Sequence, residues 1–214
     1  MRIAPEGWPF IAIGWLIQLA LVALALTLGG SWWIGAALWL LIAAWVIAFF
    51  RDPVRSGERG DDVIIAPADG KVVSIIPMHE ADVIGGPALR VSIFMNVFNV
   101  HVNCYPVSGT ITFRRYRKGS FVNAAAEKAA LENEQSDVGI TSPRGPVLAR
   151  QIAGLIARRI VTDHDAGRTV AQGERMGLIR FGSRVDVFVP AGTLITVQEG
   201  DMTVAGQTVI ARWT

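Results

Sequence analysis

The pattern of hydrophobic and polar positions changes once along the chain, near residue 50. Residues 7–50 contain no Asp, Glu, Lys or Arg, and two apolar stretches lie there, at 8–28 and 31–50. Each is close to the roughly 20 residues with which a helix crosses a bilayer core of about 30 Å. A secretory signal peptide is the alternative for the first stretch, but polar mature sequence should then follow, and a second apolar stretch follows instead. The pattern predicts a membrane-anchoring helical hairpin over residues 1–50.

The charges that flank this hairpin predict its orientation. Arg2 precedes it, Arg51, Arg55 and Arg59 follow it, and the turn between the two stretches carries no charge. Under the positive-inside rule both ends then lie in the cytoplasm. Everything after the hairpin is therefore expected on the cytoplasmic face of the inner membrane. Six of the seven tryptophans fall within residues 7–50, where they suit interfacial belts or the packing of the two helices.

After residue 50 the pattern becomes that of a β domain. Residues 51–59 are charged and rich in turn formers, and Pro53 stops a helix, so we interpret them as a junction. Residues 60–214 are enough chain for one hydrophobic core. Short apolar or alternating runs, separated by Gly, Pro, Asp and Asn, predict strands there. The strands are expected at 63–66, 71–76, 89–97, 100–105, 110–116, 147–152, 155–162, 177–181, 184–189, 194–198 and 204–213.

Helix is expected in only one or two places of this domain. Residues 121–134 are rich in Ala and have high helix propensity, and residues 155–160 form either a strand or part of a second helix. A weak repeat links residues 169–179 with 203–210, and residues 66–73 resemble a strand of a lipoyl or biotinyl carrier. The predicted fold class is α+β: a transmembrane helical hairpin, then a mainly antiparallel, barrel-sandwich-hybrid-like β domain.

Composition and charge narrow the functional classes. The chain is 51% hydrophobic with a mean hydropathy of +0.40, more apolar than an average soluble domain, and the excess lies in the hairpin. A net charge of +2 and a pI near 9.0 are too mild to indicate nucleic-acid binding. The single cysteine, Cys104, cannot form an intrachain disulfide, which agrees with a reducing compartment. We expect Cys104 to be a small buried residue of a strand.

Gly182 and Ser183 lie between two runs with strand-like alternation. Val185, Val187 and Val189 alternate with Arg184, Asp186 and Phe188, as in a half-buried strand. Glycine adopts a positive φ that other residues resist, so the pair predicts a tight corner. On composition alone an ordinary β-turn is the favoured interpretation.

Three motifs resemble the short form of the phosphatidylserine decarboxylase proenzyme family. They are Phe-Gly-Ser-Arg-Val-Asp at 181–186, Ala-Pro-Ala-Asp-Gly at 66–70 and Asn-Val-Phe-Asn-Val-His-Val-Asn at 96–103. The similarity runs from about residue 49 to the C-terminus. It implies self-cleavage between Gly182 and Ser183, into a β chain of residues 1–182 and an α chain of residues 183–214 that stay associated. It also implies that Ser183 becomes a covalent pyruvoyl group, the catalytic cofactor.

The resemblance implies a triad of Asp69, His101 and Ser183. Attack by the Ser183 hydroxyl on the Gly182 carbonyl needs a base, and a neutral imidazole is available because histidine titrates near pH 6.5. Asp69 is expected to orient His101, as in other acid-histidine-nucleophile triads. Long-form relatives carry a second histidine three residues before this one, where this chain has Phe98.

The pyruvoyl ketone is expected to form a Schiff base with the amine of phosphatidylserine and to accept the electrons released with CO₂, giving phosphatidylethanolamine. Pyridoxal phosphate is then not required. His79 and His164 are expected in polar turns without a specific role. No spacing of His or Cys indicates a metal site.

The basic run at 114–118 is a candidate for holding anionic lipid or the phosphodiester, through Arg114, Arg115, Arg117 and Lys118. In a strand these charges would point to both faces, and a solvated sheet edge is an equal alternative. The runner-up for the whole chain is a non-enzymatic, membrane-tethered, carrier-like β module, an adaptor or assembly factor. A buried interface with a second copy is compatible with a β domain of this size.

Overall fold

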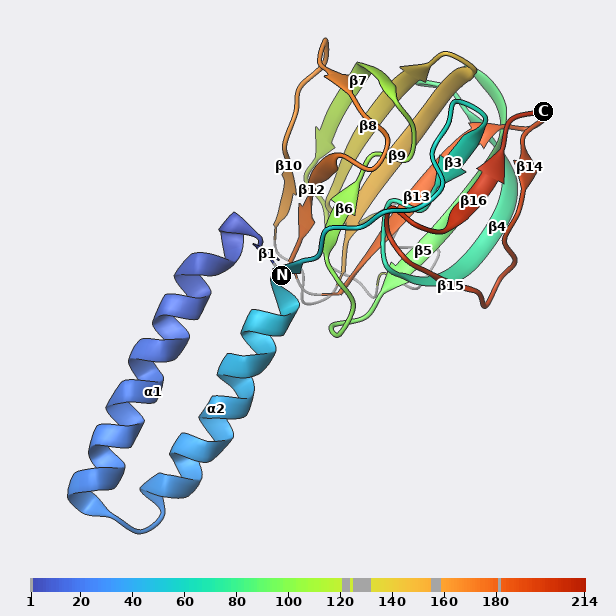
Figure 1. Ribbon diagram of the computed structural model, residues 1–214. Coiled ribbons are helices and arrows are strands. Elements are labelled where there is room, and N and C mark those ends of the chain that lie inside the picture. Colours follow the sequence, from blue (N-terminus) through green and yellow to red (C-terminus); the bar gives the residue numbers. More distant parts are fainter. Residues whose placement is uncertain (1, 121–123, 125–131, 155–158, 181) are drawn as a thin grey trace. The chain divides into compact units, whose positions relative to one another are not determined.

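The structure is a computed structural model that describes residues 2–120, 124, 132–154, 159–180 and 182–214 (Figure 1). The chain divides into two compact units, Met1–Val54 and Arg55–Thr214. The division falls within the junction predicted at residues 51–59.

The first unit is a hairpin of two apolar helices. Its elements are β1 (Arg2–Ile3), η1 (Pro5–Gly7), α1 (Trp8–Leu28), α2 (Trp32–Phe49) and β2 (Arg51–Asp52). Gly29 and Gly30, with φ of 64° and 59°, reverse the chain between the helices in a conformation that glycine tolerates best. The indole N–H of Trp39 donates to the carbonyl oxygen of Gly14 at 2.8 Å, which ties α2 to α1. The two predicted helices are therefore confirmed, and both are long and apolar enough to cross a membrane.

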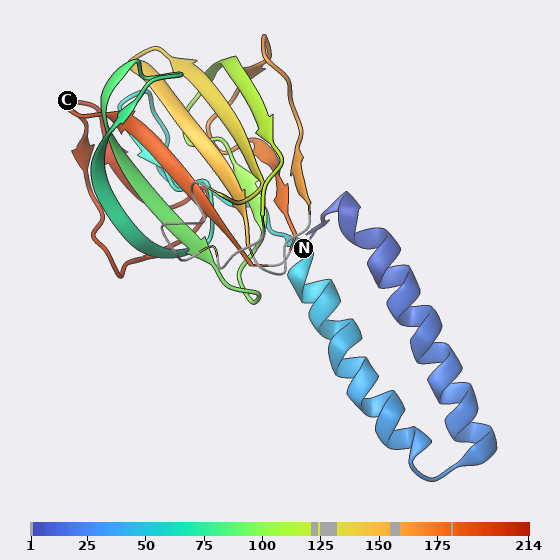
Figure 2. The ribbon, with the colours of Figure 1, turned by 180° about the vertical axis from the view of Figure 1, so that it is seen from behind.

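The second unit is a mainly antiparallel β domain. Its strands are β3 (Val63–Ile65), β4 (Gly70–Glu80), β5 (Gly86–Met95), β6 (Val102–Cys104), β7 (Gly109–Arg117), β8 (Gln135–Ser142), β9 (Gly145–Ala153), β10 (Ile160–Thr162), β11 (Thr169–Val170), β12 (Arg175–Ile179), β13 (Ser183–Pro190), β14 (Leu194–Ile195), β15 (Met202–Thr203) and β16 (Val209–Arg212). Eight of them form one sheet in the order β11-β7-β8-β9-β13-β5-β4-β15, which curls into a half-barrel (Figure 2). Two three-stranded sheets, β10-β12-β6 and β14-β16-β3, complete the domain.

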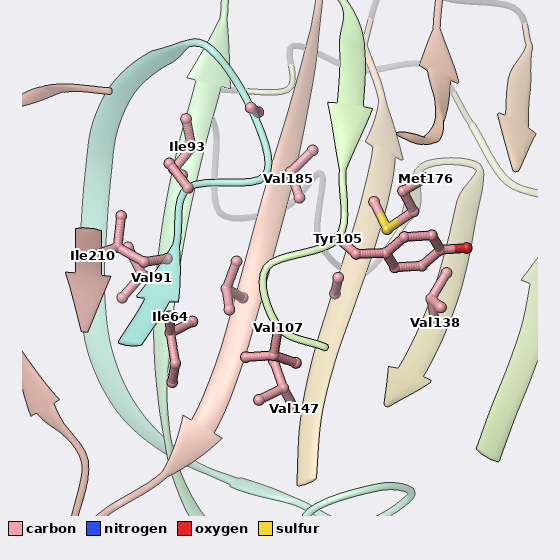
Figure 3. Packing of buried hydrophobic residues seen from close by; sticks show 14 of the residues in the cluster. Ile64, Val91, Ile93, Tyr105, Val107, Val138, Val147, Met176, Val185 and Ile210 are labelled. Carbon is pink, nitrogen blue, oxygen red and sulfur yellow. The ribbon is translucent and has the colours of Figure 1, made fainter. Parts of the chain in front are cut away.

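The core fills the concave side of the curled sheet. Val91 and Ile93 of β5 and Val185 of β13 contribute to it from the sheet, together with side chains of β8 and β9. Figure 3 shows Ile64 of β3 and Ile210 of β16 in the same cluster. Because alternate residues of a strand face the same side, this inner face is apolar along most of its length.

Strand β13 is buried on both faces, although its alternation predicted a half-buried strand. Val185 and Val187 face the core. On the other face Arg184 and Asp186 form an ion pair, with Nε to Oδ1 at 2.5 Å and Nη2 to Oδ2 at 2.8 Å. The Nε of Arg90 lies 3.8 Å from Oδ2 of the same Asp186. Paired charges can be buried where single ones cannot, so the polar face of β13 is also closed to solvent.

This ion pair belongs to a row of charges that crosses the outer face of the sheet. The register sets Asp186 of β13 opposite Arg150 of β9, Arg150 opposite Asp137 of β8, and Asp137 opposite Arg115 of β7. The fully buried carboxylate of Asp137 lies 2.6 Å from Nε of Arg150 and 3.0 Å from Nη2 of Arg115. The signs alternate from strand to strand, so each charge has opposite neighbours on the adjacent strands.

Most of the predicted strands are confirmed, and the differences have physical reasons. Strand β8 was not predicted, because it carries polar residues on both faces and buries Asp137 only by pairing it. The strand expected at 204–213 is shorter, since a turn at residues 205–207 precedes β16. The helix expected at 121–134 and the one left open at 155–160 lie mostly outside the described residues. Of the second stretch, Ile160 begins β10.

Asp137 and Asp82 both pair with Arg115, but only Asp137 is buried. Loss of the charge of Asp137 should therefore destabilise the domain far more than loss of the charge of Asp82. We expect Asp137→Asn to lower the free energy of unfolding by about 3 kcal/mol, because it removes the charge of a fully buried carboxylate and leaves the largely buried guanidinium of Arg150 without its partner. Asp82 also pairs with Arg115 but is partly exposed, so Asp82→Asn should cost less than about 1 kcal/mol. Urea denaturation of the two variants measures both, and equal losses would contradict the proposed importance of the row.

Candidate active site

Gly182 and Ser183 form a corner between two different sheets. Strand β12, before them, pairs with β6 and β10, whereas β13, which begins at Ser183, pairs with β5 and β9. The φ of Gly182 is 63°, in the left-handed region that favours glycine. The expected corner is confirmed, and it passes the chain from one layer to the other.

His101 lies against this corner and is fully buried. Its Nε2 accepts a hydrogen bond from the backbone N–H of Gly182, with a distance of 3.2 Å between the nitrogens. Its Nδ1 lies 3.1 Å from the carbonyl oxygen of Asn99, which can only accept. These two contacts describe a neutral imidazole with its proton on Nδ1. The basic nitrogen therefore faces the residue that precedes Ser183.

The Ser183 side chain is fully buried next to an unusual partner. Its Oγ lies 3.9 Å from the sulfur of Met95, the residue opposite it on β5. A thioether is a weak acceptor, so the hydroxyl is held loosely. On the other edge Ser183 faces Ala153 of β9. The hydroxyl thus has apolar neighbours on both strands.

A chain of hydrogen bonds begins at the same sulfur, buried in its first two links and partly buried in the rest. Asn103 Nδ2 lies 3.6 Å from Met95 Sδ, and Asn103 Oδ1 accepts from Gln151 Nε2 at 2.9 Å. Gln151 Oε1 accepts from the hydroxyl of Thr162 at 2.9 Å, and that hydroxyl lies 2.8 Å from the Ser136 hydroxyl. The inner face of the sheet is therefore polar near Ser183, although it is apolar elsewhere.

The structure brings His101 to Gly182, the residue before Ser183, but gives Asp69 other partners among the described residues. Arg55 donates two hydrogen bonds to the Asp69 carboxylate, at 2.5 and 2.8 Å. The backbone N–H of Ala205 donates a third at 2.8 Å. The pairing of Asp69 with His101 stays a prediction.

Three of the four cations expected to hold lipid have partners within the sheet. Arg115 and Arg117 lie on the outer face near Asp137, and Arg114 points to the other face, where it donates to the Ser136 hydroxyl at 3.3 Å. Burial lowers the pKa of Arg114. The expectation that the charges of this run point to both faces of the sheet is confirmed. Lys118 follows β7 and is exposed, and the role of the run in lipid binding stays a prediction.

The remaining candidates lie apart from this geometry or at its edge. Phe98, which stands where long-form relatives carry a histidine, lies in the turn before His101 and is 70% exposed. His79 lies in strand β4, so its expected place in a turn was wrong. His164 lies between strands, and its Nδ1 is 3.1 Å from the hydroxyl of Tyr105.

Cys104 is the buried strand residue that was expected. It lies in β6, and burial raises the pKa of its thiol to about 12, so it remains protonated. Within the described part of the chain, no three His, Cys, Asp or Glu side chains gather as metal ligands would.

Sequence reasoning missed several residues that contact the site. None of Met95, Gln151 and Arg55 was proposed for the site, yet they contact Ser183, Asn103 and Asp69 respectively. Gln151 had a signal, because it is a polar residue on the apolar alternation of β9, between Ala149 and Ala153. Met95 and Arg55 had none, since their types are ordinary in a strand and in a charged junction.

Comparisons with known proteins support the resemblance inferred from the motifs. The family model for phosphatidylserine decarboxylase matches residues 42–211. A phosphatidylserine decarboxylase proenzyme of Magnetococcus marinus is 48% identical over 213 residues, which are 98% of this chain and 94% of that protein. Proenzymes of the same name from Azorhizobium caulinodans and Xanthobacter autotrophicus are 47% and 49% identical, over 96% of this chain and 87% and 86% of their own lengths. The chain therefore belongs to the phosphatidylserine decarboxylase family.

Proposed function

We propose that this chain decarboxylates phosphatidylserine to phosphatidylethanolamine, with a pyruvoyl group that it makes from its own Ser183. The observation that carries the proposal is the contact between His101 Nε2 and the backbone of Gly182. It puts an unprotonated imidazole nitrogen beside the bond between Gly182 and the buried Ser183, where a base for self-cleavage is needed. The names of the relatives, which describe decarboxylase proenzymes, agree with a chain that matures by cleavage.

The first step is an acyl shift from nitrogen to oxygen. The Ser183 hydroxyl turns from Met95 to the Gly182 carbonyl carbon and gives its proton to His101 Nε2. The new C–O bond forms as the C–N bond of the peptide breaks, and the proton passes to the departing nitrogen. The products are an ester and a free amine. For this the N–H of Gly182 must release Nε2, which a glycine allows because its backbone rotates freely.

The second step removes the ester and leaves the cofactor. Loss of the Cα proton of residue 183 expels Gly182 as a carboxylate, with cleavage of the bond between Cβ and Oγ. Addition of water to the resulting dehydroalanine then releases ammonia and leaves the pyruvoyl group. The residues present fit that group, because its methyl and ketone are small and uncharged and the cross-strand neighbours of residue 183 are Met95 and Ala153.

In the mature enzyme the pyruvoyl group supplies a ketone that captures the substrate amine and a conjugated carbonyl that accepts the electron pair released with CO₂. His101 is the titratable side chain that we place beside this position, and we propose that it also returns the proton to the product. Such a role would compensate for Phe98, which stands where long-form relatives carry a second histidine.

We further propose that α1 and α2 anchor the enzyme in the cytoplasmic membrane, with the β domain on the cytoplasmic side. Their length and apolar composition support a membrane span, and the arginines at both ends of the hairpin support the orientation. The substrate is itself a membrane lipid, so an anchored enzyme meets it at high local concentration. Of the basic run, we propose that the exposed Lys118 contacts anionic head groups.

Self-cleavage should be visible on a denaturing gel and by intact mass. We expect two chains from the wild type, residues 1–182 and 183–214, the smaller one blocked to Edman degradation because it begins with a ketone. Ser183→Ala removes the nucleophile and should give one inactive chain. His101→Ala should slow cleavage about 100-fold, the contribution of a positioned base. An uncut wild type that still decarboxylates phosphatidylserine would exclude the pyruvoyl mechanism, and an uncut inactive one would favour a carrier-like β module.

A matched pair of variants tests whether Asp69 assists His101 directly. Asp69→Asn and Arg55→Met both remove the ion pair between these residues, but only the first removes the carboxylate. If the carboxylate assists the imidazole, Asp69→Asn should cleave at least about tenfold more slowly than Arg55→Met. Equal rates in a cleavage time course would reduce Asp69 to a structural partner of Arg55.

The anchoring role predicts how the protein divides between membrane and soluble fractions. The full chain should stay with membranes through an alkaline carbonate wash, whereas a chain of residues 55–214, which keeps Arg55 with Asp69, should be released. Its soluble form should still cleave itself, because the site lies wholly within this unit. Quantitative retention of residues 55–214 in the washed membranes would show that the hairpin is not the anchor.

A further inference from the structure

Gly154 lies directly against the bond that we propose is cut. It follows the last residue of β9, and since Ala153 is opposite Ser183, Gly154 comes next to Gly182. A Cβ atom placed on Gly154 would lie 2.2 Å from the carbonyl oxygen of Gly182 and 3.0 Å from its carbonyl carbon. Side chains do not approach a carbonyl so closely. The carbonyl group of Gly182 therefore occupies space that is free only because residue 154 has no side chain.

The backbone at Gly154 has little freedom to move away. The carbonyl oxygen of Ala153 accepts a hydrogen bond from Asn133 Nδ2 at 2.6 Å, and the N–H of Ala153 donates to the carbonyl oxygen of Glu134 at 3.0 Å. On another side, the same added Cβ would meet the methyl of Ala124 at 3.2 Å. A side chain at residue 154 would therefore displace Gly182, whose corner lies outside the regular pairing of β13.

We propose that Gly154 is a positioning residue for self-cleavage, an inference that rests on the proposed function. The absence of a side chain lets the Gly182 carbonyl turn its oxygen toward the backbone of residue 154. As the Ser183 oxygen bonds to the carbonyl carbon, the planar group becomes tetrahedral and its oxygen gains negative charge, and both changes need room around that oxygen. A methyl group at residue 154 would rotate the carbonyl and misalign the attack.

The simpler interpretation is that Gly154 serves only the fold, and Gly109 provides a matched control for it. A Cβ atom on Gly109 would lie 2.3 Å from the carbonyl oxygen of Thr141 and 2.9 Å from its carbon. The clash is of the same kind, between an added methyl and the carbonyl of an adjacent strand, and the φ of Gly109, 159°, adds backbone strain to it. Thr141 of β8 pairs with Pro146, near the start of β9, whereas Ser183 pairs with Ala153 at its end. Substitution of Gly109 therefore introduces a similar clash at the end of the strands that lies away from Ser183.

The experiment compares cleavage of the full-length wild type, Gly154→Ala and Gly109→Ala by gel and intact mass over time. Both variants should melt cooperatively, several degrees below the wild type. Gly154→Ala should cleave about 100-fold more slowly, which is the cost of a misplacement of roughly 1 Å. Gly109→Ala should stay within about threefold of the wild-type rate, because Gly109 lies away from the bond that is cut. A threefold change in rate corresponds to less than about 1 kcal/mol.

Hydroxylamine identifies the step that is slowed. It cuts an ester rapidly and leaves a hydroxamate on Gly182 and an intact Ser183, so it reports ester formation. In Gly154→Ala it should not restore the rate, because formation of the ester is itself the slow step. The fraction that does mature should decarboxylate phosphatidylserine with a kcat within about twofold of the wild type, a difference below 1 kcal/mol, because Gly182 is then a free chain end.

Several results would overturn the inference. Restoration of the rate by hydroxylamine would place the defect after the acyl shift. Loss of the cooperative melt in Gly154→Ala alone, or equal slowing in both variants, would make Gly154 a residue of the fold. Equal, rapid cleavage in all three chains would remove the inference and leave the proposed function, whereas an uncut wild type would remove both.

Discussion

The antiparallel pairing of β13 with β5 on one edge and with β9 on the other determines where Ser183 lies. Ser183 is the first residue of the strand, opposite Met95 and Ala153 at once. A residue held on both edges has little freedom along the strand. The preceding Gly182 belongs to neither pairing and has a φ of 63°. The bond that we propose is cut therefore joins a residue paired on both edges to one outside the pairing, and His101 contacts the unpaired residue.

The inner and outer faces of the eight-stranded sheet are stabilised by different interactions. On the inner face Val185 and Val187 exclude water, but at the level of Gln151 the face becomes a chain of hydrogen-bonded amides and hydroxyls. On the outer face Asp137 and Asp186 lie buried among arginines. Such pairs add little net stability compared with apolar residues, but they penalise any other register strongly, because a slip by one residue would turn the charged side chains of one strand toward the apolar inner face. The register that the ion pairs select between β13 and β9 is the one that aligns Ser183 with Ala153.

The sequence allowed much of this architecture to be predicted, but for reasons that differ from element to element. Strands with apolar alternation, such as β5 and β13, were visible because period two is a local property. Strand β8 was not, since the burial of Asp137 depends on Arg115 and Arg150 from other strands, and pairing across strands leaves no local trace. Both helices were evident because residues 7–50 are long enough for two membrane spans and contain no charged residue. The helix expected at 121–134 falls mostly on residues that the structure does not describe.

The candidate site was likewise predictable where a local motif marks it and not where it depends on contacts between distant strands. The motifs indicated Ser183, His101 and Asp69, yet they did not indicate that Arg55 holds the carboxylate of Asp69 or that Gly154 faces the Gly182 carbonyl. A glycine in a loop has many explanations, and only the opposing strand shows which one applies.

The interior position of β13 also sets the order of events in the life of the chain. Its partners, β5 and β9, are made much earlier, and pairing over such long sequence separations is the slow part of folding a β protein. Ser183, His101 and Gly154 come from three distant segments, so the bond is in place only when the late strand has inserted between the early ones. A nascent or misfolded chain has the same Gly-Ser sequence but lacks this environment. Under the proposed function, the formation of the cofactor would thus be a proofreading step, because only a chain that has completed its central sheet would become an enzyme.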